Sequence, residues 1–193
     1  GATALSGVDV TVVAAGDLNA LIAATGNAAA TSSGNLTVSG TAVNLATNSG
    51  GTTSFGVTTL TGGLTTTSVG DITQTGAITT GAPSSITSTT GDITLTNPGN
   101  SFFGATSLSG GDVTVVAAGN LNALIAATGN AAATSSGNLT VSGTAINLAT
   151  TSGGATSFGA TTLTGGLTTT SVGDITQTGA ITTGAPSSLT SST

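Results

Sequence analysis

The chain alternates apolar and polar residues in short runs, and a glycine followed by aspartate or asparagine introduces most of these runs. Residues 70–74 (Gly-Asp-Ile-Thr-Gln), 91–95 (Gly-Asp-Ile-Thr-Leu) and 111–115 (Gly-Asp-Val-Thr-Val) are examples. Gly-Asp and Gly-Asn favour turns, and strict alternation is typical of a strand with one buried face. We therefore predict a turn and a short β-strand at each of these runs.

The apolar members of the runs define the expected core. Every second residue of a strand faces the same side, so the intervening threonines, such as Thr73, Thr94 and Thr114, are expected to point outward. The side chains expected inside are Val10, Val12, Leu36, Val38, Ile72, Ile93, Leu95, Val113 and Val115.

The spacing of the runs predicts a parallel β-solenoid. Asp71, Asp92 and Asp112 follow one another at nearly equal intervals, which suits the stacked coils of a β-helix. Coils of about 20 residues predict roughly ten coils over ~45–50 Å, at ~4.8 Å per coil. The interval from Asp9 to Asn35 is longer than these, so it predicts one longer coil, with the extra length at positions 27–30.

A longer repeat contains the short one. Residues 1–90 return as residues 104–193 at an offset of 103, with nine differences in 90 aligned pairs, such as Asp17 against Asn120. The chain therefore divides into a first long repeat, 1–103, and an incomplete second one, 104–193. We expect both to belong to one continuous solenoid, because stacked repeats share a core.

Three other structures compete with this interpretation. Residues 18–24 (Leu-Asn-Ala-Leu-Ile-Ala-Ala) fit a helical stripe as well as a strand, but the glycines at 16 and 26 leave little length for a helix. A sandwich or barrel would place strands at intervals of roughly 8–12 residues. Disorder fits the abundance of Gly, Ser and Thr, but β-branched apolar residues are rare in disordered chains.

Composition excludes several functions. The chain has no Lys, Arg, His, Cys, Met, Trp, Tyr or Glu, and its net charge is −6 from six aspartates. Without basic residues it has nothing to neutralise phosphates, so we expect no nucleic-acid partner and no binding to anionic membranes. Apolar stretches such as residues 12–15 are too short to insert into a membrane, and no signal-peptide pattern opens the sequence at Gly1.

The repeats resemble a known class of bacterial surface proteins. Residues 70–79 (Gly-Asp-Ile-Thr-Gln-Thr-Gly-Ala-Ile-Thr) and 91–102 (Gly-Asp-Ile-Thr-Leu-Thr-Asn-Pro-Gly-Asn-Ser-Phe) are similar to repeats of filamentous-haemagglutinin-like exoproteins of the two-partner-secretion or autotransporter type. The resemblance implies a right-handed parallel β-helix, export through an outer-membrane pore, and roles in adhesion, aggregation or biofilm. The chain departs from these proteins in having no secretion-signal domain and no basic residue.

The only candidate chemistry is carboxylate chemistry. A nucleophilic Ser or Thr needs a base, and no His, Lys or Cys supplies one, so we expect no enzyme, no catalytic residue and no cofactor. Asp71, Asp92 and Asp112 are expected to stack in a column, which could serve a carboxylate-based polysaccharide enzyme or a calcium ion. Because Asn35 and Asn138 occupy the same place in the pattern, we favour a turn-capping role for each aspartate and predict no metal site.

Threonines and phenylalanines offer a second kind of site. Thr-x-Thr pairs begin at Thr59, Thr73 and Thr94, and a flat threonine face could bind glycan or ice. The opposing explanation is that threonine pairs well with threonine across neighbouring strands. The four phenylalanines are expected to be core or corner residues, with a small aromatic binding patch as the alternative; they are Phe55, Phe102, Phe103 and Phe158.

These observations favour a structural segment of an extracellular bacterial surface fibre or adhesin, with a threonine-face binding module for glycan or ice as the alternative. Such a segment would serve attachment, cell–cell contact or biofilm. Neither end of the sequence shows a polar capping coil, so the expected partners are further copies of the repeat, in the same chain or stacked head to tail. Glycans of host or neighbouring cells are the other expected partners.

Overall fold

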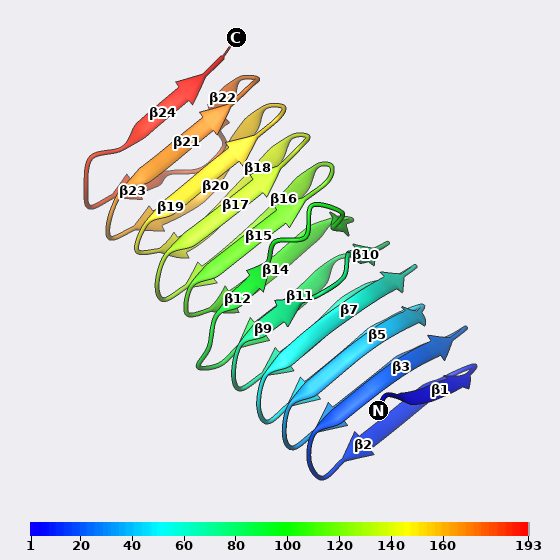
Figure 1. Ribbon diagram of the computed structural model, residues 1–193. Coiled ribbons are helices and arrows are strands. Elements are labelled where there is room, and N and C mark those ends of the chain that lie inside the picture. Colours follow the sequence, from blue (N-terminus) through cyan, green and yellow to red (C-terminus); the bar gives the residue numbers. More distant parts are fainter. Residues whose placement is uncertain (193) are drawn as a thin grey trace.

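The computed structural model describes residues 1–192, which form two parallel β-sheets facing each other across a flat, elongated core (Figure 1). The chain crosses from one sheet to the other after nearly every strand, and the coils stack in a right-handed solenoid with the two termini at opposite ends. The predicted fold class is confirmed. Among the described residues there is no helix, and hence no helix that could span a membrane.

Sheet A has thirteen strands and sheet B has eleven. Sheet A consists of β1 (Thr3–Gly7), β3 (Leu18–Ala24), β5 (Leu36–Ala42), β7 (Thr53–Leu60), β9 (Ile72–Gln74), β10 (Ile78–Thr80), β12 (Ile93–Leu95), β13 (Ser101–Phe102), β15 (Val113–Ala117), β17 (Ala131–Ser135), β19 (Leu148–Ser152), β21 (Leu167–Ser171) and β24 (Ser188–Ser191). Sheet B consists of β2 (Val10–Ala14), β4 (Ala28–Ser32), β6 (Leu45–Ser49), β8 (Leu64–Ser68), β11 (Ser84–Ser88), β14 (Ala105–Gly110), β16 (Leu121–Ala127), β18 (Leu139–Ala145), β20 (Thr156–Leu163), β22 (Ile175–Gln177) and β23 (Ile181–Thr183).

The coils are close to the predicted length but unequal. Asp17 and Asn35 hold the same place in successive coils and lie 18 positions apart in sequence, whereas Asn35 and Thr52 lie 17 positions apart. From Asp71 to Asp92 the separation is 21 positions. The extra residues of the longer coils lie in the turns and in a bulge of β7, where Gly56 and Val57 together face Ser39 of β5.

The prediction of one long coil between Asp9 and Asn35 is wrong. These two residues lie on opposite edges of the solenoid, because Asp9 precedes a strand of sheet B and Asn35 precedes a strand of sheet A. Asp9 stacks instead on Asn27, and Asp17 stacks on Asn35, at a sequence separation of 18 in both cases. Residues 27–30 therefore add no length: Asn27 is the turn residue before β4, and residues 28–30 begin this regular strand.

The 103-residue repeat does not contain a whole number of coils. From β3 the chain passes through β5, β7, β9, β12 and β15, which is five coils, and reaches the equivalent strand β16 half a coil later. Strand β3 belongs to sheet A, whereas β16, which has the same sequence, belongs to sheet B. The second repeat is therefore turned by half a coil relative to the first, and each copy presents the same surface on the opposite face of the solenoid.

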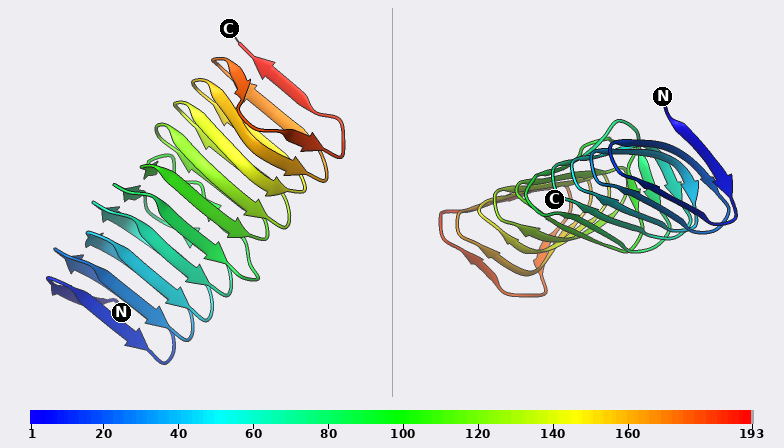
Figure 2. Two further views of the ribbon diagram at one scale, coloured as in Figure 1. Left: turned by 180° about the vertical axis from the view of Figure 1, so that it is seen from behind. Right: turned by 90° about the horizontal axis from the view of Figure 1, so that it is seen from below.

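The core follows the predicted alternation. Eight of the nine side chains expected inside are buried, and Val12 is half-buried against the same core near the first coil. Residues 18–24 form a strand in which Leu18, Ala20 and Ile22 are buried, so the helical alternative is wrong. Each fully buried Leu, Ile or Val contributes roughly 1.5–3 kcal/mol. Figure 2 shows how thin the coils are, which explains why small residues fill much of the interior.

Hydroxyl groups also line the inside of the solenoid. The last residue of several sheet B strands is a buried serine, and each hydroxyl donates to a turn carbonyl: Ser32 to Gly16 at 2.6 Å, Ser68 to Gly51 at 2.8 Å and Ser88 to Gly70 at 2.9 Å. These bonds satisfy carbonyl oxygens where the chain turns between sheets. Serine and threonine in this chain are thus core residues as well as surface residues.

Candidate functional site

Asp and Asn side chains form columns along both edges of the solenoid, at the residue before many of the strands. Asp71 accepts a hydrogen bond from the backbone N–H of Asp92 at 2.9 Å, and Asp92 accepts one from Asp112 at 2.8 Å. Asp112 in turn accepts from the N–H of Asn130 at 2.6 Å. The predicted column exists, but each side chain caps the turn of the following coil rather than its own.

Asparagine performs the same task in these columns. Asn35 accepts from the N–H of Thr52 at 3.0 Å, and Asn120 accepts from the N–H of Asn138 at 2.8 Å. An Oδ1 can therefore cap these turns whether or not it carries charge, although Thr52 and Ala155 hold the same place in their coils without one. The described residues contain no group of three Asp, Glu, His or Cys side chains arranged to hold a metal ion.

Replacing Asp71, Asp92 and Asp112 together by asparagine is expected to leave the fold and its thermal stability intact, because each new Oδ1 still faces the N–H of the next coil. The same three residues changed to alanine should lose about 1 kcal/mol each, because the acceptor is gone. Circular dichroism melting measures both. A wild-type melting temperature that falls on adding a chelator would contradict us and favour the calcium alternative.

Threonines form short outward columns rather than one flat face. Thr73, Thr94 and Thr114 stack, but the next strand places Ala132 beside Thr114. Thr59 belongs to a different column, with Thr41 on one side and Thr79 on the other. The three Thr-x-Thr pairs therefore do not share one array.

The four phenylalanines divide into two environments. Phe55 and Phe158 are fully buried and Phe102 is 5% exposed, as expected for core residues. Phe103 lies at the corner between β13 and β14 but is 67% exposed, so the expectation that it is packed there is wrong. Of the two adjacent rings, Phe102 is therefore packed in the core and Phe103 faces solvent.

A buried asparagine explains how the segment before Phe103 is held. Asn100 is fully buried, and its Oδ1 accepts from the N–H of Ile78 at 2.9 Å. Its Nδ2 donates to the Gln74 side chain at 2.8 Å and to the carbonyl of Val116 at 3.1 Å. This side chain joins three coils at the point where the segment leaves the regular outline of the solenoid, near β14 in Figure 1.

The chain on both sides of Phe103 is also fixed. The short strand β13 pairs with β10, and the N–H of Phe103 donates to the carbonyl of Thr80 at 3.3 Å. Gly104 follows with a φ of +76°, and a Cβ there would lie 3.0 Å from the Pro83 ring, so glycine is required for the turn into β14. The exposed ring is presented by a well-anchored backbone.

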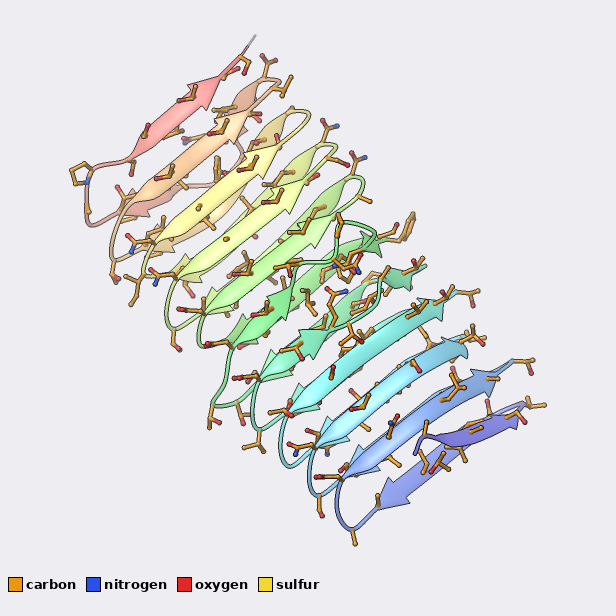
Figure 3. The ribbon with its side chains drawn as sticks, viewed as in Figure 1. Carbon is orange, nitrogen blue, oxygen red and sulfur yellow. The ribbon has the colours of Figure 1, made fainter. Side chains whose placement is uncertain are left out.

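A hollow of about 540 Å³ lies beside this ring. Phe103 lines one part of it, and two coils of sheet B line the rest, with Asn120 and Asn122 on one coil and Asn138 and Thr140 on the next. Successive coils are ~4.8 Å apart, and alternate residues of a strand are roughly 6.8 Å apart, so the four polar groups form a small grid. Figure 3 shows the rows of side chains that such stacking produces from one strand to the next.

Two further hollows are copies of each other. One, of about 390 Å³, lies over Ala29 and Ala46, and the other, of about 470 Å³, lies over Ala132 and Ala149. They occupy equivalent positions in the two repeats and open on opposite faces, as the half-coil offset requires. No exposed aromatic ring lines either of them.

Sequence reasoning missed Asn100 and the Phe103 hollow. A signal was present, because residues 97–100 (Asn-Pro-Gly-Asn) interrupt the regular pattern with turn residues, and two adjacent phenylalanines follow after Ser101. These residues lie in the part of the first repeat that has no counterpart in the second. The comparison of the two copies therefore drew no attention to them.

Comparison with known proteins gives a family but no function. No curated protein and no solved structure was found to be similar to this chain. The expected likeness to filamentous-haemagglutinin-like exoproteins therefore stays a prediction. One sequence family, described as repeats of unknown function (DUF5649), matches residues 42–109 and 145–193. These ranges cover more than half of the chain and begin at equivalent positions of its two repeats, so the chain belongs to this family of repeats.

Proposed function

We propose that this chain is a structural segment of an extracellular bacterial surface fibre or adhesin. Such a fibre projects from the cell and attaches to other surfaces, in adhesion, cell–cell contact or biofilm. The observation that carries the proposal is the junction between the two repeats, where the solenoid continues without a break. Ile86 of the first repeat pairs with Leu108 of the second, and Ile93 pairs with Val113.

The junction shows how the solenoid can be extended by further repeats. Backbone hydrogen bonds, the apolar core and the aspartate column all cross it, as the bond from the Asp112 N–H to Asp92 illustrates. One repeat can therefore stack on another by the same contacts that hold coils together within a repeat. A contact of this type does not close on itself, so it generates a filament.

The composition supports an inert, exposed role. The chain has no His, Lys or Cys to activate a nucleophile, and no Lys or Arg to attract nucleic acid. Its outer faces carry Thr, Ser, Ala and Asn in short columns, with scattered exposed Val and Leu side chains. A rod with neutral, hydroxyl-rich faces suits the outside of a cell, where it must stay soluble while spanning distance.

Adding one further long repeat to the chain is expected to lengthen the rod by ~26 Å, which is five and a half coils at ~4.8 Å, without changing its width. Small-angle scattering measures length and cross-section, and electron microscopy of the unextended chain should show rods that associate end to end. Discrete monomers that never elongate, or a wider particle after the addition, would overturn the filament proposal.

The location can be tested separately. Antibodies raised against this segment should label filaments outside the cell. The measurement is electron microscopy of intact cells that make the protein. Label confined to the interior of sectioned cells would contradict the extracellular assignment, whatever the rods do in solution.

A further inference from the structure

We propose that the hollow beside Phe103 binds a neutral glycan, with the exposed phenyl ring against the apolar face of a sugar and the grid of Asn and Thr side chains on its hydroxyls. This inference gives the proposed surface fibre a ligand class, and it rests on an exposed phenyl ring that the core of the solenoid does not use.

The ring is the first requirement. A phenylalanine that is 67% exposed loses the stabilisation of burial, yet its backbone is fixed by Asn100 before it and Gly104 after it. Every other described phenylalanine in the chain is buried. Aromatic rings are large apolar surfaces, and the C–H face of a pyranose is the part of a sugar that can pack on one.

The polar grid is the second requirement. Asn120 and Asn138 each use Oδ1 for the turn of the next coil, which leaves their Nδ2 groups without a partner among residues 1–192. Asn122 and Thr140 are exposed neighbours on adjacent strands, and their side chains likewise have no partner in the described part of the chain. Amides and hydroxyls both donate and accept, which is the capacity that sugar hydroxyls need.

The absence of charge near the hollow decides the kind of glycan. Its lining contains no Asp, and the chain has no Lys, Arg or His that could pair with a sialic acid, a uronic acid or a sulphate. The next aspartate along this edge is Asp174, three coils beyond Asn120. A neutral oligosaccharide therefore fits the site, and an acidic one does not.

The first repeat offers a matched control. Asp17, Asn19, Asn35 and Thr37 occupy the positions equivalent to the grid, but in the described chain no aromatic ring stands beside them. Asn19 and Asn122 have the same neighbours in sequence, are both exposed, and lie in equivalent strands, β3 and β16. Changing each to alanine therefore removes the same amide with and without an adjacent ring.

The experiment uses an array of neutral oligosaccharides of glucose, galactose, mannose and N-acetylglucosamine, with sialylated and sulphated glycans as the acidic set. Ligands found there are measured by calorimetry with the whole chain. Phe103→Ala should weaken binding at least tenfold, and Asn122→Ala should weaken it roughly three- to tenfold. Asn19→Ala should have no effect, and all three variants should keep the wild-type circular dichroism spectrum.

Several outcomes would overturn the proposal. These are no binding to any neutral glycan, binding that Phe103→Ala leaves unchanged, or a preference for the acidic set. Loss of self-association by Phe103→Ala in sedimentation, with no glycan bound, would assign the ring to contacts between chains and would also overturn it. Since the ring lies outside the stacking contacts, the rods of the proposed fibre should persist in this variant, so failure here is distinguishable from failure of the fibre.

Discussion

Gly40→Ala should lower the free energy of unfolding by about 3 kcal/mol or more, the largest loss expected from any single methyl group in the first repeat. Gly40 lies at a β-bulge between β5 and β7, with a φ of +122°. A Cβ at this position would lie 1.8 Å from the carbonyl oxygen of Ile22 on the neighbouring strand. Neither the side chain nor the paired strand β3 can move away, because both belong to the solenoid wall.

For a chain of this size the loss corresponds to a fall of roughly 6–12 °C in melting temperature, measurable by circular dichroism. Hydrogen exchange should place the damage at β3 and β5, since a solenoid can open locally. Gly16→Ala is the control, because a Cβ there meets nothing within 4 Å. Gly143→Ala repeats the experiment in the second copy, where φ is +124°. Melting of Gly40→Ala within a degree of wild type would refute the role of the bulge.

Asn100→Leu should cost about 3 kcal/mol or more for a different reason. The change preserves size but leaves the N–H of Ile78 and the carbonyl of Val116 buried without their partner, and the Gln74 amide loses both of its bonds to Asn100. Each stranded polar group costs about 1–3 kcal/mol. Thermal melting measures the sum, and hydrogen exchange should show early opening at β10 and β13.

Asn100→Asp sharpens this test, because it keeps the acceptor for Ile78 while replacing the donor with an oxygen that faces two carbonyls. A buried charge without a partner is costly, and protonation of the carboxyl restores a donor. The defect of Asn100→Asp should therefore be large at neutral pH and smaller in acid, whereas that of Asn100→Leu should not depend on pH. Asn19→Leu, at an exposed position, is the control. A pH-independent defect in Asn100→Asp would contradict the assigned network.

Most of the fold could be predicted because it depends on local signals. The alternation of Ile72, Thr73 and their equivalents determines which side chains point inward, and the recurrence of Asp71, Asp92 and Asp112 determines the stacking. The pattern could not show that Asp9 and Asn35 belong to different edges, because both edges use the same turn chemistry. The half-coil offset between repeats was hidden for the same reason.

The candidate site was harder to predict because it depends on contacts far apart in sequence. Nothing adjacent to Asn100 in the sequence shows that Gln74, Ile78 and Val116 surround it. The general tendency of phenylalanine to be buried holds for Phe102 but not for Phe103. The path of the backbone after Asn100 decides which of the two neighbouring rings faces the core. A departure from the repeat, rather than the repeat itself, marks this region.

The half-coil offset has a consequence for arrays of this repeat. Where units follow one another in tandem, any surface feature returns to the same side only after two units, or ~53 Å for eleven coils. Gaining or losing a single unit would turn all coils beyond it by half a coil, so their surface features would move to the opposite face. Gaining or losing a pair of units would change only the length of the rod. Whether the number of repeats is odd or even would then determine which side of the rod its distal part presents. Recombination between the nearly identical copies could change that side without altering any residue of the distal part.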